Sequence, residues 1–132
     1  MPQMTQKNIR CQQGQVEKVL PISSGGLRLR LLSNGKVLPK VSVFHVTLPA
    51  KYRHSSLYHA RTHEWFYVLE GRTTVIIDGK PRRLHPGSFV YIAPKVAHVV
   101  GTGNHPVKVL VLFSPPMEAK NPDIRMAKNG QT

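Results

Sequence analysis

Residues 59–71 read HARTHEWFYVLEG, and this stretch does most to decide the fold. Its centre, Trp65 to Leu69, is a run of aromatic and branched residues that favours an extended strand, closed by a glycine. Residues 73–77 (TTVII) form a second β-rich run. Asp78-Gly79 follows and leads into residues 80–84, which is a strong signal for a two-residue hairpin. The stretch therefore predicts three consecutive short strands.

The same rhythm continues on both sides of this stretch. Upstream, leucines alternate with arginines from residue 27, and Asn34-Gly35 between two apolar runs predicts another tight hairpin. No window of eleven or more residues has a convincing helical period. Further strands are predicted at residues 37–48, 89–92, 98–100 and 107–113. About eight short strands separated by turn residues predict an all-β sandwich or barrel.

A chain of 132 residues is long enough for one domain with one hydrophobic core. Its 11 prolines and 10 glycines are spread along the sequence and leave little room for long helices. We expect an irregular N-terminal arm at residues 1–26, a β-barrel at 27–114 and a polar tail at 115–132. The tail is expected to be loose or to form a short helix over one face.

The charge is unusually positive, with 19 Lys+Arg against 6 Asp+Glu and a net charge of +13. The basic residues are dispersed rather than gathered in a stripe, which argues against a nucleic-acid-binding surface and for a solvated basic one. Cys11 is the single cysteine, so no internal disulfide is expected. The first residues lack the apolar core of a secretory signal, and we expect a cytoplasmic protein.

Histidines concentrate around the stretch quoted first. His54, His59 and His63 lie within ten residues and are followed at once by Glu64, while His98 lies in a later predicted strand. If His59 and Glu64 flank a turn between adjacent strands, their side chains can converge on one interior face. His98 can then join them from its own strand.

At this point the sequence resembles the cupin superfamily. The spacing of His59, Glu64 and Gly71 matches the end of the first cupin motif, and residues 84–98 (LHPGSFVYIAPKVAH) are similar to the second. The resemblance extends over about residues 27–114. It implies a small single-domain, RmlC-like cupin, whose fold is a double-stranded β-helix (jelly-roll) barrel, and it implies one metal ion inside that barrel.

Several motif positions depart from the family pattern. The first motif histidine is replaced by Leu57, and the opening glycine by Lys51. In the second motif the proline and the glycine are replaced by Ala93 and Lys95, and a following asparagine by Thr102. The family's usual ligand set of three histidines and one glutamate is therefore incomplete here.

The ligands that remain are His59, Glu64 and His98. Two imidazoles and one carboxylate suit a divalent Fe, Zn, Mn or Ni ion and do not choose among them. His54 could swing in to replace the histidine missing at position 57. His63 points to the opposite face of an extended strand, and would become an acid-base catalytic group only if the backbone bulges.

Structural interpretations of the same residues stay open. His59 could be a core histidine bonded to a backbone carbonyl, and Glu64 could pair with Arg61. A buried carboxylate among aromatic residues must become neutral or find a cation, and either a metal ion or an arginine would supply one. A metal-free barrel is therefore the alternative to a metal site.

The main functional hypothesis is a metal-binding cupin that binds or acts on a small, anionic molecule in the barrel mouth. The resemblance implies dioxygenase-, decarboxylase- or isomerase-like chemistry, and whether the protein is an enzyme stays open. A second hypothesis is a non-enzymatic binding or sensor module without a catalytic metal. A third is a basic surface that binds nucleic acid or an acidic partner.

A homodimer is expected, because pairing would protect exposed strand edges.

Overall fold

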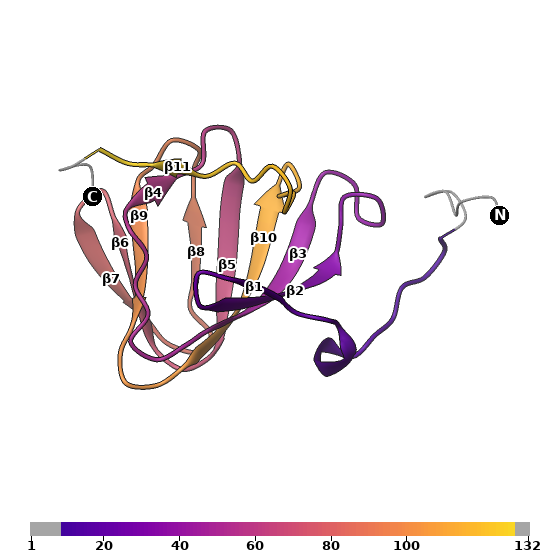
Figure 1. Cartoon of the computed structure of the whole chain (residues 1–132), viewed down its shortest axis with the longest axis horizontal. Helices are drawn as coiled ribbons and strands as arrows, with labels where there is room; N and C mark the ends of the chain where they lie inside the picture. Colours follow the sequence, from indigo (N-terminus) through magenta and orange to yellow (C-terminus); the bar gives the residue numbers. More distant parts are fainter. Residues whose placement is uncertain (1–8, 129–132) are drawn as a thin grey trace.

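The computed structural model describes residues 9–128, and it confirms the predicted all-β jelly roll (Figure 1). Two antiparallel sheets face each other and enclose the core. The strands are β1 (Ile22–Ser24), β2 (Leu27–Ser33), β3 (Ser42–Leu48), β4 (Leu57–Tyr58), β5 (His63–Glu70), β6 (Thr73–Ile77), β7 (Lys80–Leu84), β8 (Phe89–Ile92), β9 (His98–Thr102), β10 (Val107–Ser114) and β11 (Arg125–Met126).

The two sheets alternate along the chain, as the jelly-roll topology requires. The six-stranded sheet has the order β1-β2-β3-β10-β5-β8, and the five-stranded sheet has the order β11-β4-β9-β6-β7. Strands β3, β5 and β10 lie at the centre of the larger sheet and alternate buried with less buried residues. This period of two places one row of side chains between the sheets and the other on the outer face.

The core lies between the sheets and consists of aliphatic and aromatic side chains from both. Its buried members are Phe44, Val46, Leu48, Phe66, Val68, Val75, Leu84, Ile92, Val107, Val109 and Val111. Val68, Val75 and Val107 are completely buried. The β-branched residues that favoured strands in the sequence are thus also the residues that fill the interior.

Of the two predicted hairpins, one is confirmed, and the other has the expected antiparallel pairing but not the expected tight turn. Asp78 and Gly79 both have positive φ, as a two-residue turn needs, and Ile77 pairs with Lys80 across it. In the other, β2 pairs with β3, but residues 35–40 form a longer run of turns and β3 begins at Ser42 rather than at residue 37. The Asn34 side chain accepts a hydrogen bond from the Lys36 amide, which favours a local turn over a strand ladder.

Gly71, which ends the stretch quoted first, is required by the backbone. Its φ is +82°, and a Cβ at this position would lie 2.6 Å from the Pro106 carbonyl oxygen. The chain can therefore turn from β5 into β6 directly against the start of β10 only without a side chain. This turn fixes the register of the strand that carries Glu64.

Both ends of the chain are more ordered than the sequence suggests, within the part that the structure describes. The predicted N-terminal arm contains a 3₁₀ turn at Val16–Lys18 and strand β1, which pairs with β2. The predicted tail crosses one end of the barrel as an extended strap, residues 115–127, and its β11 pairs with β4 (Figure 1).

None of the helical segments in residues 9–128 is long and apolar enough to cross a membrane.

Candidate metal centre

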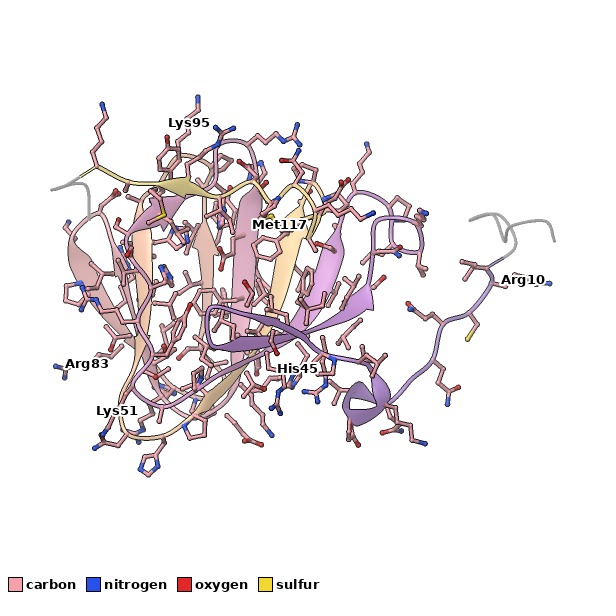
Figure 2. All side chains as sticks on the ribbon, viewed as in Figure 1. Arg10, His45, Lys51, Arg83, Lys95 and Met117 are labelled. Atoms are coloured by element: carbon pink, nitrogen blue, oxygen red, sulfur yellow. The ribbon has the colours of Figure 1, made fainter. Side chains whose placement is uncertain are left out.

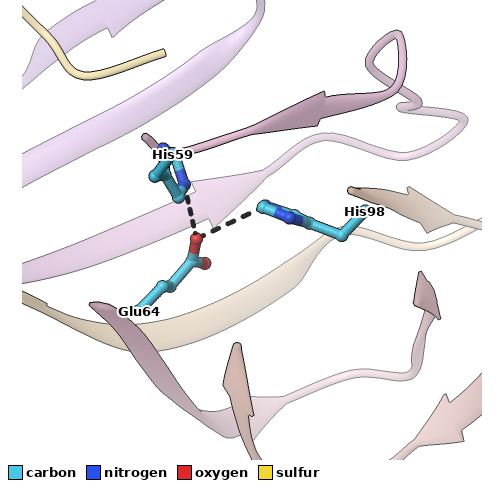
Figure 3. Close-up of side chains that lie close together, drawn as sticks. All are labelled: His59, Glu64 and His98. Carbon is cyan, nitrogen blue, oxygen red and sulfur yellow. Dashed lines mark hydrogen bonds and ion pairs between the residues drawn. The ribbon is translucent and has the colours of Figure 1, made fainter. Parts of the chain in front are cut away.

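Three ionisable side chains meet inside the barrel at the end covered by the strap. The Nε2 atom of His59 lies 2.9 Å from Oε1 of Glu64, and the Nε2 atom of His98 lies 3.5 Å from the same oxygen (Figure 3). All three residues are buried, with 5%, 8% and 2% of His59, Glu64 and His98 exposed. We call these three residues the metal centre.

The three residues come from both sheets. His59 directly follows β4 of the five-stranded sheet, and Glu64 is the second residue of β5 in the six-stranded sheet. The turn between them therefore carries the chain from one sheet to the other, and the two side chains converge in the interior as the sequence suggested. His98 begins β9, the neighbour of β4. The convergence follows from the jelly-roll crossing.

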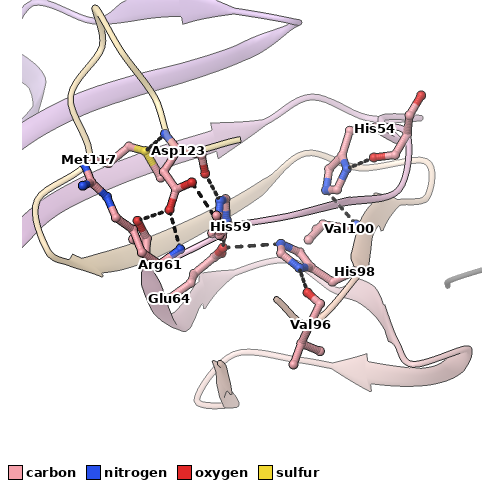
Figure 4. Close-up of polar contacts among 12 residues, drawn as sticks. His54, His59, Arg61, Glu64, Val96, His98, Val100, Met117 and Asp123 are labelled. Atoms are coloured by element: carbon pink, nitrogen blue, oxygen red, sulfur yellow. Dashed lines mark hydrogen bonds and ion pairs between the residues drawn. The ribbon is translucent and has the colours of Figure 1, made fainter. Parts of the chain in front are cut away.

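Backbone carbonyls fix the orientation of both imidazoles. Nδ1 of His59 lies 2.7 Å from the Asp123 carbonyl oxygen, and Nδ1 of His98 lies 3.0 Å from the Val96 carbonyl oxygen (Figure 4). Because a carbonyl only accepts, each Nδ1 carries the proton. In a neutral ring Nε2 then has a free lone pair, and both lone pairs face Glu64. This is the outer-shell arrangement that orients metal-ligating histidines.

The pKa values describe the same centre as a site that needs a cation. Burial would raise the pKa of Glu64, but hydrogen bonds and charge from His59 and His98 lower it to about 2. Burial would lower the pKa of His59, but its bond to Glu64 and the Asp123 carbonyl raise it above the usual value. Glu64 is thus an anion, and either a proton on His59 or a metal ion can compensate it.

The donor set fits a divalent ion. The candidate ligand atoms all lie within 4.8 Å of one another. Ligands about 2.0–2.2 Å from a common Zn²⁺-like ion are themselves about 3–3.5 Å apart, which is close to the two separations quoted above. The set of two histidines and one carboxylate leaves coordination positions open for water or substrate.

A family model described as "Cupin domain" matches residues 44–113, which is more than half of the chain. The protein belongs to the cupin family. The matched range contains all three residues of the metal centre and both motifs recognised in the sequence.

Three relatives show how far this likeness extends. The chain is 33% identical over 67 residues to the uncharacterized protein MJ1618 of Methanocaldococcus jannaschii, covering 50% of this chain and 54% of that protein. It is 33% identical over 58 residues to quercetin 2,3-dioxygenase of Bacillus subtilis, covering 44% of this chain but 17% of that enzyme. The chain thus spans about half or less of the curated relatives that it matches.

Ectoine synthase from P. lautus has the same fold. The two structures superpose with a TM-score of 0.73 at 15% sequence identity, covering 92% of this chain and 96% of that one. At this identity the likeness establishes the cupin fold alone.

The structure shows how the chain accommodates its departures from the cupin motifs. Lys51 and Lys95, which replace the motif glycines, both have positive φ (57° and 71°), so the glycine backbone conformation is kept at a small cost in strain. The Lys95 amide donates to the His59 carbonyl oxygen, which joins the two motifs. Leu57, which replaces the first motif histidine, pairs directly with His98 across the β4–β9 ladder. Their side chains therefore share one face of the sheet.

His54 does not join the metal centre of this cupin. Its Nε2 accepts a hydrogen bond from the Val100 amide, and its Nδ1 lies 2.7 Å from the Ser55 carbonyl oxygen (Figure 4). Both ring nitrogens are thus used by the backbone, and burial lowers the pKa of the ring and keeps it neutral. His54 contacts His98 edge to face, with ring centroids 6.1 Å apart. It supports a ligand rather than replacing the missing one.

His63 lies on the outer face of β5, as the alternation of the strand predicted. Its ring is exposed and stacks on Tyr91, and its Nδ1 lies 2.6 Å from the Tyr91 hydroxyl. Glu64, its neighbour, points inward. The backbone does not bulge at this point, and His63 is separated from the metal centre by the sheet itself.

Asp123 is the residue that sequence reasoning missed. Its carboxylate accepts hydrogen bonds from the amides of Ala60 and Arg61 and from the Thr62 hydroxyl, at 3.0, 2.9 and 2.7 Å (Figure 4). Its carbonyl at the same time accepts from Nδ1 of His59. The strap therefore holds the turn that positions His59. The one sequence signal was that Asp123 is among only six acidic residues in a strongly basic chain.

We expect Asp123→Asn to lower both stability and metal affinity. Burial would raise the pKa of Asp123, but the bonds from Arg61, Thr62 and Ala60 lower it to about 2, below the ordinary value of about 3.9. A depressed carboxyl pKa stabilises the fold above pH ~4, and this contribution is lost as the pH falls toward 2. The stability gap between wild type and D123N should therefore narrow in urea unfolding from pH 5 to pH 2.5.

The matched control is Asp78→Asn, at an exposed hairpin position where asparagine tolerates the positive φ. Metal affinity of D123N should fall by about 10-fold or more, as is typical when an outer-shell partner of a ligand is lost. A stability difference between wild type and D123N that stays constant with pH, or an unchanged metal affinity in D123N, would contradict the role assigned to Asp123.

Proposed function

We propose that this cupin is a metal-dependent protein that binds or acts on a small anionic molecule at the metal centre. One observation carries the proposal: two buried imidazoles, each fixed by a carbonyl at Nδ1, direct their Nε2 atoms at one buried carboxylate. A proton on His59 would relieve only one of these two contacts, because the Nε2 lone pair of a neutral His98 would still face the negative charge. A divalent ion satisfies all three groups together.

Charge favours an anionic ligand. Two neutral imidazoles and one carboxylate leave a divalent ion with a net charge of about +1 at the centre of a barrel whose chain carries +13. The ligand must also be small, because the metal-centre side chains are almost fully buried under the strap. A small carboxylate, enolate or phosphate meets both conditions.

The reaction class is open between dioxygenase-, decarboxylase- and isomerase-like chemistry. When bound, a divalent ion would polarise an oxygen of the substrate. The residues of this chain hold the ligand set in place, and Phe113 packs edge to face on His59 at 5.7 Å and excludes water on that side. A dioxygenase is among the sequence relatives and a synthase is among the proteins of the same fold, which supports an enzyme without fixing its reaction. A metal-free binding module is the alternative.

The test begins with elemental analysis of protein purified without added metal. The proposal expects about one equivalent of iron, zinc, manganese or nickel. The loaded protein is then screened for thermal stabilisation by small carboxylates, sugar acids and phosphate esters, and for oxygen consumption with those that bind. A protein that stays metal-free, and whose melting temperature ignores every added divalent ion, would favour the metal-free alternative.

We also propose that the protein is a homodimer that pairs through the outer face of the six-stranded sheet. Four rings there, Trp65, Tyr67, Phe89 and Tyr91, form what we call the aromatic face. Phe89 and Tyr91 are 63% and 55% exposed. Because the four rings are uncharged, a second copy can meet this face about a two-fold axis without adding to the repulsion between two basic chains.

We expect Phe89→Asp to convert a dimer to a monomer in sedimentation velocity at micromolar concentration, because a carboxylate would be buried between the two aromatic faces. Met126→Asp is the matched control, since Met126 is also 63% exposed but lies on the strap. Wild-type protein that sediments as a monomer at about 100 μM would rule the dimer out. A dimer that dissociates in M126D but not in F89D would also contradict the proposed interface.

A further inference from the structure

A cleft of about 490 Å³ lies at the end of the barrel opposite the metal centre. On β9, His98 stands at one end of the strand and the cleft residues Gly101 and Thr102 at the other. Figure 2 shows Lys95, which bonds to His59, at one end of the molecule, and Arg83 of the cleft at the other. The cleft is therefore a separate site, built from different residues.

Strand register explains how the cleft is formed. Arg53 pairs with Gly101 of β9, Gly101 pairs with Thr74 of β6, and Thr74 pairs with Arg83 of β7. Residues paired in this way project from the same face of the sheet, with neighbouring strands about 4.8 Å apart. Thr73 and Val75 are buried in the core, so Thr74 and its row face outward.

Glycine forms the floor of this row and arginine its walls. Gly101 has no side chain between Arg53 on one side and Thr74 on the other, and Arg83 follows beyond the small side chain of Thr74. Arg72 lies two residues before Thr74 and so extends the same face, and His85 does so beyond Arg83. Three arginines thus line a cleft whose floor includes a position without a side chain.

In the described part of the chain, no carboxylate pairs with these arginines. The carboxylates of Glu64, Glu70 and Asp123 form ion pairs with other residues, and no ion pair within residues 9–128 involves Arg53, Arg72 or Arg83. Their side chains also make none of the hydrogen bonds found in the described part of the chain. Three like charges around one cleft repel one another, and an anion in the cleft would remove that cost.

We propose that this arginine cleft binds a small molecule that carries a diphosphate or larger polyphosphate group. A guanidinium presents two parallel N–H donors, which match two phosphate oxygens, and three of them match a charge near −3 better than that of a single carboxylate. The volume lies in the range of small-molecule sites and would hold a nucleotide-sized ligand. The cleft needs no metal, so the proposal goes beyond the function of the metal centre.

The probe is inorganic tripolyphosphate, titrated calorimetrically into the full chain at physiological salt. We expect saturable binding of one equivalent, weakened at least 10-fold in Arg83→Ala. Arg82→Ala is the matched control: it removes the same charge from the next residue, which pairs with Val75 and does not line the cleft, and it should change affinity less than two-fold.

Gly101→Val tests the shape of the cleft without changing its charge. A Cβ at Gly101 would lie 3.6 Å from the nearest atom, the Tyr52 carbonyl oxygen, which is an ordinary contact. This variant should therefore fold and yet lose at least 10-fold in affinity, because the side chain fills the floor. Circular dichroism and thermal unfolding verify that it has folded.

Three outcomes would overturn the proposal. The first is equal weakening by R82A and R83A, which would show that the net charge alone attracts the anion. The second is loss of binding in His98→Ala, which would place tripolyphosphate at the metal centre. The third is a short oligonucleotide that binds more tightly than tripolyphosphate, with a steep salt dependence, which would indicate a nucleic-acid surface instead. Retention of binding in H98A separates this test from that of the metal centre.

Discussion

Replacing His98 with alanine is expected to remove the metal from the purified protein, and His59→Ala should do the same. Each substitution deletes one of three protein ligands from a buried site and leaves only one imidazole and one carboxylate to hold the ion. Loss of an outer-shell partner already costs about 10–100-fold in affinity, so loss of a ligand should cost more than about 100-fold. Elemental analysis of wild type and both variants measures this directly.

The stability of these variants provides a second readout. Wild-type protein at a metal concentration about 100 times its Kd should gain about 2.7 kcal/mol of unfolding free energy, and the variants should gain none. His54→Ala is the control, because His54 lies beside His98 but both its ring nitrogens are bonded to the backbone. A variant at position 59 or 98 that keeps a full equivalent of metal would contradict the assigned ligands, and so would complete metal loss in folded H54A.

The second large expected effect is a gain in metal affinity. Leu57→His should tighten metal binding by about 10-fold or more, which corresponds to at least about 1.4 kcal/mol. Leu57 pairs directly with His98, so a histidine there places its ring on the same face and completes the four-ligand set of the cupin motif. A competition titration against a chromophoric chelator compares the affinities of the two proteins.

Leu57→Asn is the control for this gain, since it introduces a polar group that is a poor ligand for these ions. Because Leu57 is partly exposed, neither change should unfold the barrel. Unchanged affinity in L57H would mean that the space beside His98 is closed to a ring. In that case the open coordination position of the metal centre would lie elsewhere than beside Leu57.

The sequence by itself determined the fold class, and it singled out the three residues that the structure brings together as a candidate metal site. Period-two alternation in residues 63–70 and 107–114 and the Asp78-Gly79 turn are local properties, since each depends on neighbours within a few positions. The histidine and glutamate spacing could be read as a cupin motif for the same reason. The prediction of a tight hairpin at Asn34-Gly35 was wrong because the Asn34 side chain bonds within its own loop and starts a longer turn.

Only the tertiary structure decided what surrounds these residues. Asp123 lies more than sixty positions from His59 along the chain, yet it fixes the proton of that ring, and no local pattern encodes such a contact. His54 was excluded as a ligand by a bond to Val100 from another strand. The arginine cleft likewise exists because strand pairing brings Arg53 and Arg83 into one row with Gly101 and Thr74 between them. Hydrogen bonds and charges act through space, so their partners become known only when the sheets are in register.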